Sequence, residues 1–401
     1  MIATVFATAT ATATGSVGDD LVVFTAGDLS MSVWPGKGDG TFGAPHARGV
    51  DDARFSYFRD MNGDGAPDLV TSQFVYLNRG NGVFDTLQRY DVSDAQFLKG
   101  GDVADVDGDG HPDVIAARSL EVYFHRGHGD GTVEAGKLIY QDVDCPTPRV
   151  ADLDRDGKLD VLCWNFSRIG WLRGAGDGTY AKYSLIDADY TTSITLADLD
   201  GDGAVDLLRQ YYGEVIVYRG DGHAGFKRVA EYADGDVTAA IDLDGDGHPD
   251  LVSPLGVESN VYAMRGRGDA TFDSTPVMPS RAEGPQPIVA TDFDGDGKQD
   301  LMWVEKGQFS SWWEVMTCIS AGNGRCRTLV DTFGSEQYGF AIQPSGADIG
   351  DYDGDGSFEV ARRSPGTTLN DLLVGDLRRQ RPRHRVQPHA TLSLRDEGGC
   401  L

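Results

Sequence analysis

The chain of 401 residues has no long run of apolar side chains and far fewer basic than acidic residues. Without an apolar stretch of about 20 residues, we expect no membrane span. Lys and Arg number 35 against 63 Asp and Glu, and the formal charge of −28 argues against nucleic-acid binding by the body of the chain. Neither GxSxG nor HExxH occurs, and the eight His are scattered. We therefore expect a chain without a catalytic constellation, and not an enzyme.

Cysteine is sparse, and its five residues give mixed evidence. Cys318 and Cys326 flank the segment AGNG symmetrically, so we expect them to face each other across a hairpin, as a disulfide or as packed thiols. Cys145 and Cys163 flank an acidic loop but are out of register by about four residues, which predicts buried thiols. Cys400 has no evident partner. No His or Asn constellation accompanies these residues, so a nucleophilic cysteine is not indicated.

Aspartate and glycine, by contrast, are abundant, and they recur in seven copies of one nine-residue loop. The loop reads DLDGDGHPD in its most regular form, and each copy is followed at once by an apolar run. The copies begin at Asp60, Asp105, Asp152, Asp198, Asp242, Asp292 and Asp351. Their spacing of 44 to 59 residues is typical of a repeat architecture.

Each copy places oxygen-bearing side chains at positions 1, 3, 5 and 9 and a glycine at position 6. Ca²⁺ prefers six to eight oxygen ligands, and a glycine at the sharp turn lets short Asp side chains converge on one point. The backbone carbonyl of position 7 adds a further oxygen. The pattern predicts up to seven Ca²⁺ sites, with these ligands: Asp60, Asn62, Asp64, Ala66 and Asp68; Asp105, Asp107, Asp109, His111 and Asp113; Asp152, Asp154, Asp156, Lys158 and Asp160; Asp198, Asp200, Asp202, Ala204 and Asp206; Asp242, Asp244, Asp246, His248 and Asp250; Asp292, Asp294, Asp296, Lys298 and Asp300; Asp351, Asp353, Asp355, Ser357 and Glu359.

The EF-hand shares the first half of this pattern, but two features exclude it. An EF-hand needs a bidentate Glu at position 12 and a helix on each side. Position 12 holds Thr71, Ala116, Cys163, Arg209, Ser253, Trp303 and Arg362. The flanking segments, such as SITLA before a loop and VLCW after one, are short and β-like, without helical periodicity.

A second element follows the loops: an alternating strand and a glycine-rich turn, as in VYFHRGHGDGTV (122–133) and VIVYRGDGHAGF (215–226). One repeat therefore predicts a four-stranded antiparallel unit of about 45 residues, the size of a propeller blade. DLDGDGHPDLV followed by YRGDG and TF resembles the FG-GAP/VCBS repeat, the blade of integrin α-chain propellers and of many bacterial secreted proteins. The resemblance covers roughly residues 20–375 and implies an all-β propeller with Ca²⁺ between the first two strands of each blade.

We expect seven blades, with the strands of residues 20–45 completing the last one. An eight-bladed ring, with residues 1–45 as a blade of their own, is the alternative. Residues 1–19 form an amino-terminal segment without Lys or Arg, a poor signal peptide whose alternation favours a strand. Residues 376–401 form an Arg-rich tail, either an appendage or a basic patch that docks on an acidic surface.

Three functions fit a calcium-binding propeller, because the fold does not itself name one. The first is an extracellular or periplasmic module that recognises a protein or glycan on one face; cytosolic free calcium is too low for ordinary sites. The second is a scaffold component of a larger secreted or toxin-type assembly. The third is a polysaccharide-acting enzyme, which would need a basic cluster that the sequence does not show outside the tail. The six Trp fit blade core better than exposed sugar platforms, and HRGHGD (125–130) is only weakly metal-like.

Overall fold

The computed structural model describes residues 21–25, 30–34, 46–49, 56–79, 83–89, 98–142, 144–233, 239–255, 260–273, 283–291, 299–306, 313–320, 326–331, 347–350, 359–363 and 372–376. All regular structure in these ranges is β, in 29 strands. The described part of the chain contains no helix long and apolar enough to cross a membrane.

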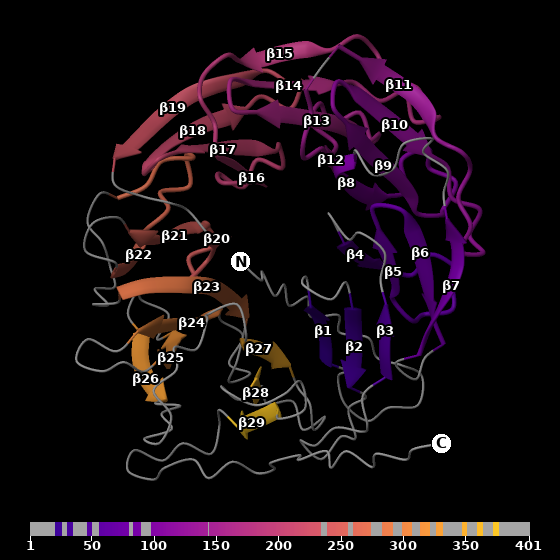
Figure 1. The fold of residues 1–401 in the computed structure, drawn as a ribbon. Coiled ribbons are helices and arrows are strands. Elements are labelled where there is room, and N and C mark those ends of the chain that lie inside the picture. The colour runs from indigo at the N-terminus through magenta and orange to yellow at the C-terminus, as the bar shows by residue number, and fades with distance from the viewer. Residues whose placement is uncertain are drawn as a thin grey trace, which may run out of the picture.

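Eight antiparallel sheets follow one another in chain order around a ring (Figure 1). Each sheet is a meander, in which strands consecutive in sequence are hydrogen-bonded neighbours. Five sheets have four described strands: β4 (Ser56–Arg59), β5 (Asp68–Thr71), β6 (Phe74–Asn78) and β7 (Phe84–Arg89); β8 (Leu98–Ala104), β9 (Asp113–Arg118), β10 (Glu121–His125) and β11 (Lys137–Gln141); β12 (Arg149–Ala151), β13 (Asp160–Asn165), β14 (Arg168–Leu172) and β15 (Ser184–Asp187); β16 (Ser193–Ala197), β17 (Asp206–Tyr211), β18 (Glu214–Gly220) and β19 (Phe226–Ala233); β23 (Glu283–Thr291), β24 (Asp300–Lys306), β25 (Trp313–Ser320) and β26 (Cys326–Asp331).

The other three sheets have three described strands each: β1 (Leu21–Thr25), β2 (Ser30–Trp34) and β3 (His46–Gly49); β20 (Ala239–Ile241), β21 (Asp250–Leu255) and β22 (Asn260–Met264); β27 (Ala347–Gly350), β28 (Glu359–Arg363) and β29 (Leu372–Asp376). The predicted all-β propeller of four-stranded antiparallel blades is thus confirmed.

The number of sheets follows the alternative of eight and not the expected seven. Within the described residues, β1, β2 and β3 pair with one another and form a sheet of their own, so they do not complete the last blade. The difference lies in β3, which begins at His46, just beyond residues 20–45, the segment that we expected to complete the last blade. Three strands give that segment its own meander.

The hydrophobic core lies between neighbouring sheets, because adjacent residues of one strand face opposite sides. On β17, Leu207 packs against the β12–β15 sheet, whereas Leu208 packs against the β20–β22 sheet. Both faces of a middle strand are therefore buried, which explains the continuous apolar runs after the loops. Trp164 and Trp171 belong to the same inter-sheet core as Leu207, as expected for these two tryptophans.

The meander fixes what lies at each end of a sheet. The acidic loop joins the first strand to the second, and the glycine-rich turn joins the third to the fourth, so both lie at one end. The turn between the second and third strands lies at the other end. We call these the loop end and the hairpin end of the propeller.

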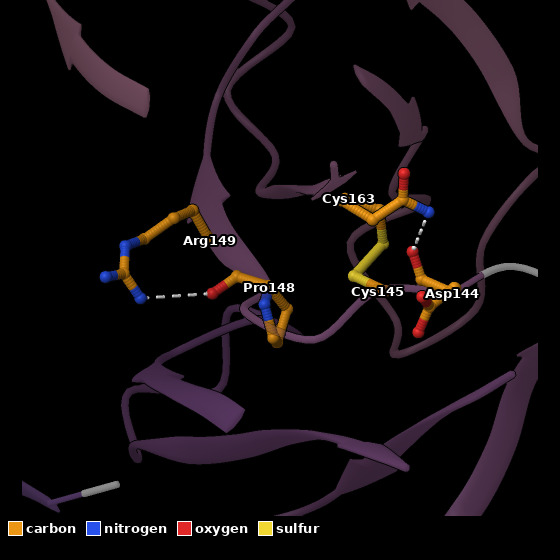
Figure 2. Close-up of a disulfide and its surroundings, with 6 residues drawn as sticks. Asp144, Cys145, Pro148, Arg149 and Cys163 are labelled. Atoms are coloured by element: carbon orange, nitrogen blue, oxygen red, sulfur yellow. Dashed lines mark hydrogen bonds between the residues drawn. A yellow bond between two sulfur atoms is a disulfide. The ribbon is translucent and has the colours of Figure 1, made fainter. Parts of the chain in front are cut away.

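One disulfide ties the link between two neighbouring sheets to the second of these sheets, contrary to the expected pair of buried thiols. Cys145 lies in the segment that leads from β11 to β12, and its sulfur is bonded to that of Cys163 on β13 (Figure 2). The Asn165 side chain donates a hydrogen bond of 3.0 Å to the Asp144 carbonyl beside it. The sequence register was misleading because Cys145 lies in this connecting segment and not in a strand that pairs with β13.

The expected facing of Cys318 and Cys326 is also wrong. Cys326 lies opposite Ser320, and Cys318 lies opposite Thr328, in the pairing of β25 with β26. The hairpin is therefore not centred on AGNG, and a shift of two residues separates the two cysteines along the ladder.

Candidate metal centre

The first aspartate of each described loop folds back onto the glycine amides of its own loop. Asp105 accepts a hydrogen bond at Oδ1 from Gly108 N and another at Oδ2 from Gly110 N, both 2.9 Å long. Asp60, Asp198 and Asp242 are held by their loop glycines in the same way. Gly110 has a φ of 89°, a conformation that a side chain would strain, which explains the constant glycine at position 6.

The ninth residue is the first residue of the second strand in all seven repeats, Asp300 and Glu359 included. In five repeats its carboxylate is buried and joins the loop to the segment around the glycine-rich turn. Asp206, for example, accepts from Leu199 N (2.8 Å) at Oδ2 and from Gly220 N (2.7 Å) at Oδ1. The other four are Asp68, Asp113, Asp160 and Asp250.

The glycine that donates to the ninth carboxylate lies very close to the backbone just before that residue. A Cβ on Gly220 would lie 2.2 Å from the Val205 carbonyl oxygen, and the corresponding Gly127, Gly174 and Gly266 meet the same obstacle. Only glycine therefore lets the third strand reach the ninth carboxylate, and this accounts for the glycine in each of these four Arg-Gly turns.

These contacts leave carboxylate oxygens grouped within four loops. In each group, one oxygen from each of three aspartates lies within 4.8 Å of the others: Asp105, Asp107 and Asp113; Asp152, Asp154 and Asp160; Asp198, Asp200 and Asp206; Asp242, Asp244 and Asp246. Three of the groups use positions 1, 3 and 9, and the fourth uses positions 1, 3 and 5. Each group can hold a metal ion.

One oxygen tests whether a cation fits this arrangement. Asp152 Oδ1 is buried and has no hydrogen-bond partner. At position 4 of this loop Arg155, with a φ of 58°, replaces the glycine whose amide caps the first aspartate elsewhere. A buried carboxylate oxygen without a donor costs free energy, and a cation bound there would supply its missing partner. The residues therefore fit a hard divalent cation.

An arginine spans each of these four loops, and the sequence analysis missed it. Arg219 is the penultimate residue of β18, the third strand of its sheet, and its Nε lies 2.5 Å from Asp200 Oδ2 and its Nη2 3.1 Å from Asp202 Oδ2. Arg126, Arg173 and Arg265 pair with the third and fifth aspartates of their loops in the same way. The sequence did carry a signal for these arginines, because an Arg precedes the glycine of each of these four turns. Each guanidinium offsets part of the loop's negative charge from outside.

The first loop differs because its third residue is neutral. The Asn62 side chain donates a hydrogen bond of 3.0 Å to Asp64 Oδ2, the oxygen that an arginine contacts in the other loops. Arg79 instead pairs with Asp85 at 2.7 Å. Asn62 thus replaces both a charge and an ion pair.

Burial raises the pKa of Asp68, Asp113, Asp160, Asp206 and Asp250 to about 6. The backbone donors on each carboxylate counteract this shift, and the neighbouring loop carboxylates add to it. A divalent cation in the loop would act in the opposite direction, because a nearby positive charge favours the ionised carboxylate.

The structure engages positions 5 and 7 in a hydrogen bond between them. The backbone N–H of position 7 donates to Oδ1 of position 5, for example from Ala204 to Asp202 over 2.7 Å; Ala66, His111, Lys158 and His248 do the same. The predicted ligation by Asp109, Asp156 and Asp202, and by the position 7 carbonyls, stays a prediction. Residues 292–298 and 351–358, the bodies of the last two loops, lie outside the described residues.

The HRGHGD stretch does not form a two-histidine site. The His125 side chain is fully buried at the end of β10, with Nδ1 3.1 Å from the Glu134 carbonyl oxygen. His128 is exposed, and its Nε2 lies 4.0 Å from a carboxylate oxygen of Glu134. The two rings therefore face different surroundings.

Together, the ring of meander sheets and the acidic loop between the first two strands define a β-propeller with repeated metal-loop motifs. A model of the FG-GAP-like repeat matches residues 60–116, 105–163, 152–209, 198–253 and 242–303, so that the matches span more than half of the chain. The chain belongs to the FG-GAP repeat family.

One solved structure shares the fold at low sequence identity, and a second gives a weaker match. An Agrocybe aegerita lectin, described by its specific recognition of non-reducing terminal N-acetylglucosamine, superposes with a TM-score of 0.58 at 19% identity, over 83% of this chain and 94% of the lectin. The Tc holotoxin pore of Photorhabdus luminescens matches with a TM-score of 0.40 at 13% identity, over 92% of this chain but only 19% of that one. No curated protein sequence matches this chain significantly.

Proposed function

We propose that this chain is an extracellular or periplasmic recognition module, a β-propeller that Ca²⁺ stabilises and whose ligand is a protein or a glycan. The observation that carries the metal assignment is the convergence of three aspartates in each of four loops, one with a buried carboxylate oxygen that lacks a donor. All side-chain donors in these loops are oxygens, which hard cations prefer.

Calcium fits these loops better than magnesium. Mg²⁺ requires a near-ideal octahedron and keeps several of its waters, whereas Ca²⁺ accepts six to eight oxygens in irregular geometry. The oxygens here are fixed by hydrogen bonds within the loop, as those of Asp105 are by Gly108 and Gly110. A cation that tolerates the geometry offered is therefore favoured.

Two observations support a location outside the cytosol. The disulfide between Cys145 and Cys163 is typical of an oxidising compartment. Calcium loops of ordinary affinity also need the calcium concentrations found outside cells. FG-GAP repeats are moreover common in extracellular proteins.

Recognition is favoured over catalysis because the carboxylates that could act as an acid–base pair are occupied in the loops. In the five loops whose ninth carboxylate the structure describes, it accepts at least two backbone hydrogen bonds, and four of the third aspartates are ion-paired with an arginine. The lectin that shares the fold is a binding protein, which supports a binding role by analogy of fold.

Titration of chelator-stripped protein with Ca²⁺, followed by calorimetry, tests the metal assignment. We expect at least four equivalents bound, one for each group of three aspartates. Failure to bind any calcium would remove this part of the proposal.

A glycan array and a screen of extracellular protein fragments, both run with calcium present, test recognition. Binding without turnover is the expected result. Release of unsaturated sugars from a polysaccharide would instead identify an enzyme. Co-purification in a large complex from its native source would favour the scaffold alternative.

A further inference from the structure

Exposed apolar side chains gather at the hairpin end, away from the acidic loops. Six large apolar residues are more than 40% exposed among those whose side chains are described. Four of them, Leu120, Phe166, Tyr190 and Tyr212, lie in turns between second and third strands or in the link between two sheets. The other two lie on the outer strands β11 and β15. Clustered exposure of this kind is typical of an interaction surface.

Three tyrosines form a continuous group within this surface. The rings of Tyr190 and Tyr211 are stacked with centroids 5.4 Å apart, and the ring of Tyr212 stands edge-on to Tyr211 at 4.7 Å. Tyr212 is 79% exposed, with a φ of 41°, an uncommon conformation for an aromatic residue. The neighbouring hairpin is tied to this group, because Thr191 N donates to the Phe166 carbonyl over 3.1 Å.

Two residues before Tyr211 on β17, one buried guanidinium contacts three carboxylates. Arg209 is 2% exposed, and its Nη atoms lie 3.4 Å from Asp187, 3.0 Å from Asp189 and 3.7 Å from Glu214. Its Nε is buried and has no hydrogen-bond partner. The Tyr218 hydroxyl also donates to Asp187. The interface between the β12–β15 and β16–β19 sheets thus holds these carboxylates in place.

The carboxylates outnumber the cations around this site. Glu231, which is ion-paired with Arg228, is the fourth carboxylate, and Arg209 and Arg228 are the two guanidinium groups. A side-chain hydrogen bond to Glu231 raises the pKa of Glu214, as expected for two carboxyl groups that share too little positive charge. Asp189 and Glu214 remain 55% and 37% exposed.

We propose that the tyrosine group, with Asp189 and Glu214, is a binding site for an arginine or lysine side chain on an extended segment of a protein partner. Ring faces attract cations, and the surplus of carboxylates gives a cationic group a second attraction that an uncharged ligand lacks. An anionic ligand would be repelled. Arg209 is a positioning residue whose ion pairs hold Asp187, Asp189 and Glu214.

This proposal rests on the proposed recognition function and names the chemistry of its partner. The test uses the full chain saturated with Ca²⁺, at physiological salt, so that empty acidic loops do not capture the probe. The probe is a short fluorescent peptide of alternating arginine and glycine, and its matched control has citrulline in place of every arginine. Binding is measured by fluorescence anisotropy.

We expect the arginine peptide to bind at least tenfold more tightly than the citrulline peptide. Tyr212→Ala should weaken binding about fivefold, and Tyr212→Phe, which keeps the ring, should bind as the wild type does. Asp189→Asn should weaken binding about threefold and reduce its dependence on salt. Two control variants should leave affinity unchanged: Leu185→Ala, an exposed apolar residue of β15, and Asp273→Asn, an exposed carboxylate at the loop end.

Equal binding of the two peptides, no binding of either, or equal losses in the tyrosine and control variants would each overturn the proposal. Displacement of the peptide by an uncharged oligosaccharide would also overturn it, in favour of a glycan site. If the calcium-bound protein fails this peptide test but binds a ligand at another surface, the recognition function still holds and only this proposal is refuted. If the protein bound neither calcium nor any ligand, both the proposed function and this proposal would be refuted.

Discussion

Removal of calcium should lower the melting temperature by about 13 °C. At a calcium concentration of a hundred times Kd, each site stabilises the folded state by about 2.7 kcal/mol. Four loops bring three aspartates together, so their sites sum to about 11 kcal/mol. Unfolding entropy of roughly 2.1 cal/mol/K per residue gives about 0.84 kcal/mol/K for a chain of 401 residues. The stabilisation of about 11 kcal/mol divided by this unfolding entropy gives the expected shift of about 13 °C.

Differential scanning calorimetry with saturating Ca²⁺, and with EDTA after dialysis, measures this shift. Mg²⁺ added to the chelated protein should restore little of it, because its octahedral shell suits these loops less well. The arginines that span the loops offset part of the repulsion between the carboxylates, so the chelated protein should still melt from a folded state. A melting temperature that EDTA does not change, with no calcium in the purified protein, would refute the reasoning.

Three further outcomes follow from particular side chains. Replacing Cys145 and Cys163 by Ser should cost about 3 kcal/mol, given a loop of 18 residues, and a thiol titration of the wild type checks that the bond exists. Asp154→Ala should reduce calcium-saturated stability by roughly 1–3 kcal/mol and Asn62→Ala by less, since the latter ligand is already neutral; equal losses would contradict this ranking. Burial lowers the pKa of His125 from 6.5 to about 4, so the folded state binds fewer protons than the unfolded state between these values. The contribution of His125 to stability should therefore fall as pH falls through this window, by up to about 3 kcal/mol, and denaturant melts with calcium present should lack this loss in His125→Gln.

The acidic loops and the class of fold were predictable because they depend on local chemistry. Glycine at position 6 and aspartates at fixed spacing define one loop conformation whatever the rest of the chain does. The apolar runs after each loop indicated strands buried on both faces, and Leu207 and Leu208 are buried against opposite neighbours. A seven-fold repeat then indicated the ring.

Contacts between repeats were not predictable, because spacing within a repeat says nothing about its neighbours. The disulfide joins a connecting segment to a strand of the next sheet, so no ladder register could reveal it. Arg209 lies at position 12, where the sequence analysis asked only whether a Glu was present, and its carboxylate partners Asp187 and Asp189 come from the preceding sheet and the link after it. The number of sheets depended on whether the short strands β1, β2 and β3 would pair with one another or with the last sheet.

The disulfide also bears on how the chain would respond to tension. A pulling force transmitted along the backbone cannot extend the segment between Cys145 and Cys163, because the covalent bond bypasses it. With 18 residues at about 3.5 Å each, roughly 60 Å of contour length stays hidden until the bond is reduced. The disulfide is therefore a mechanical clamp around β12 and the third acidic loop, and stretching single molecules with and without reductant would show that extra length.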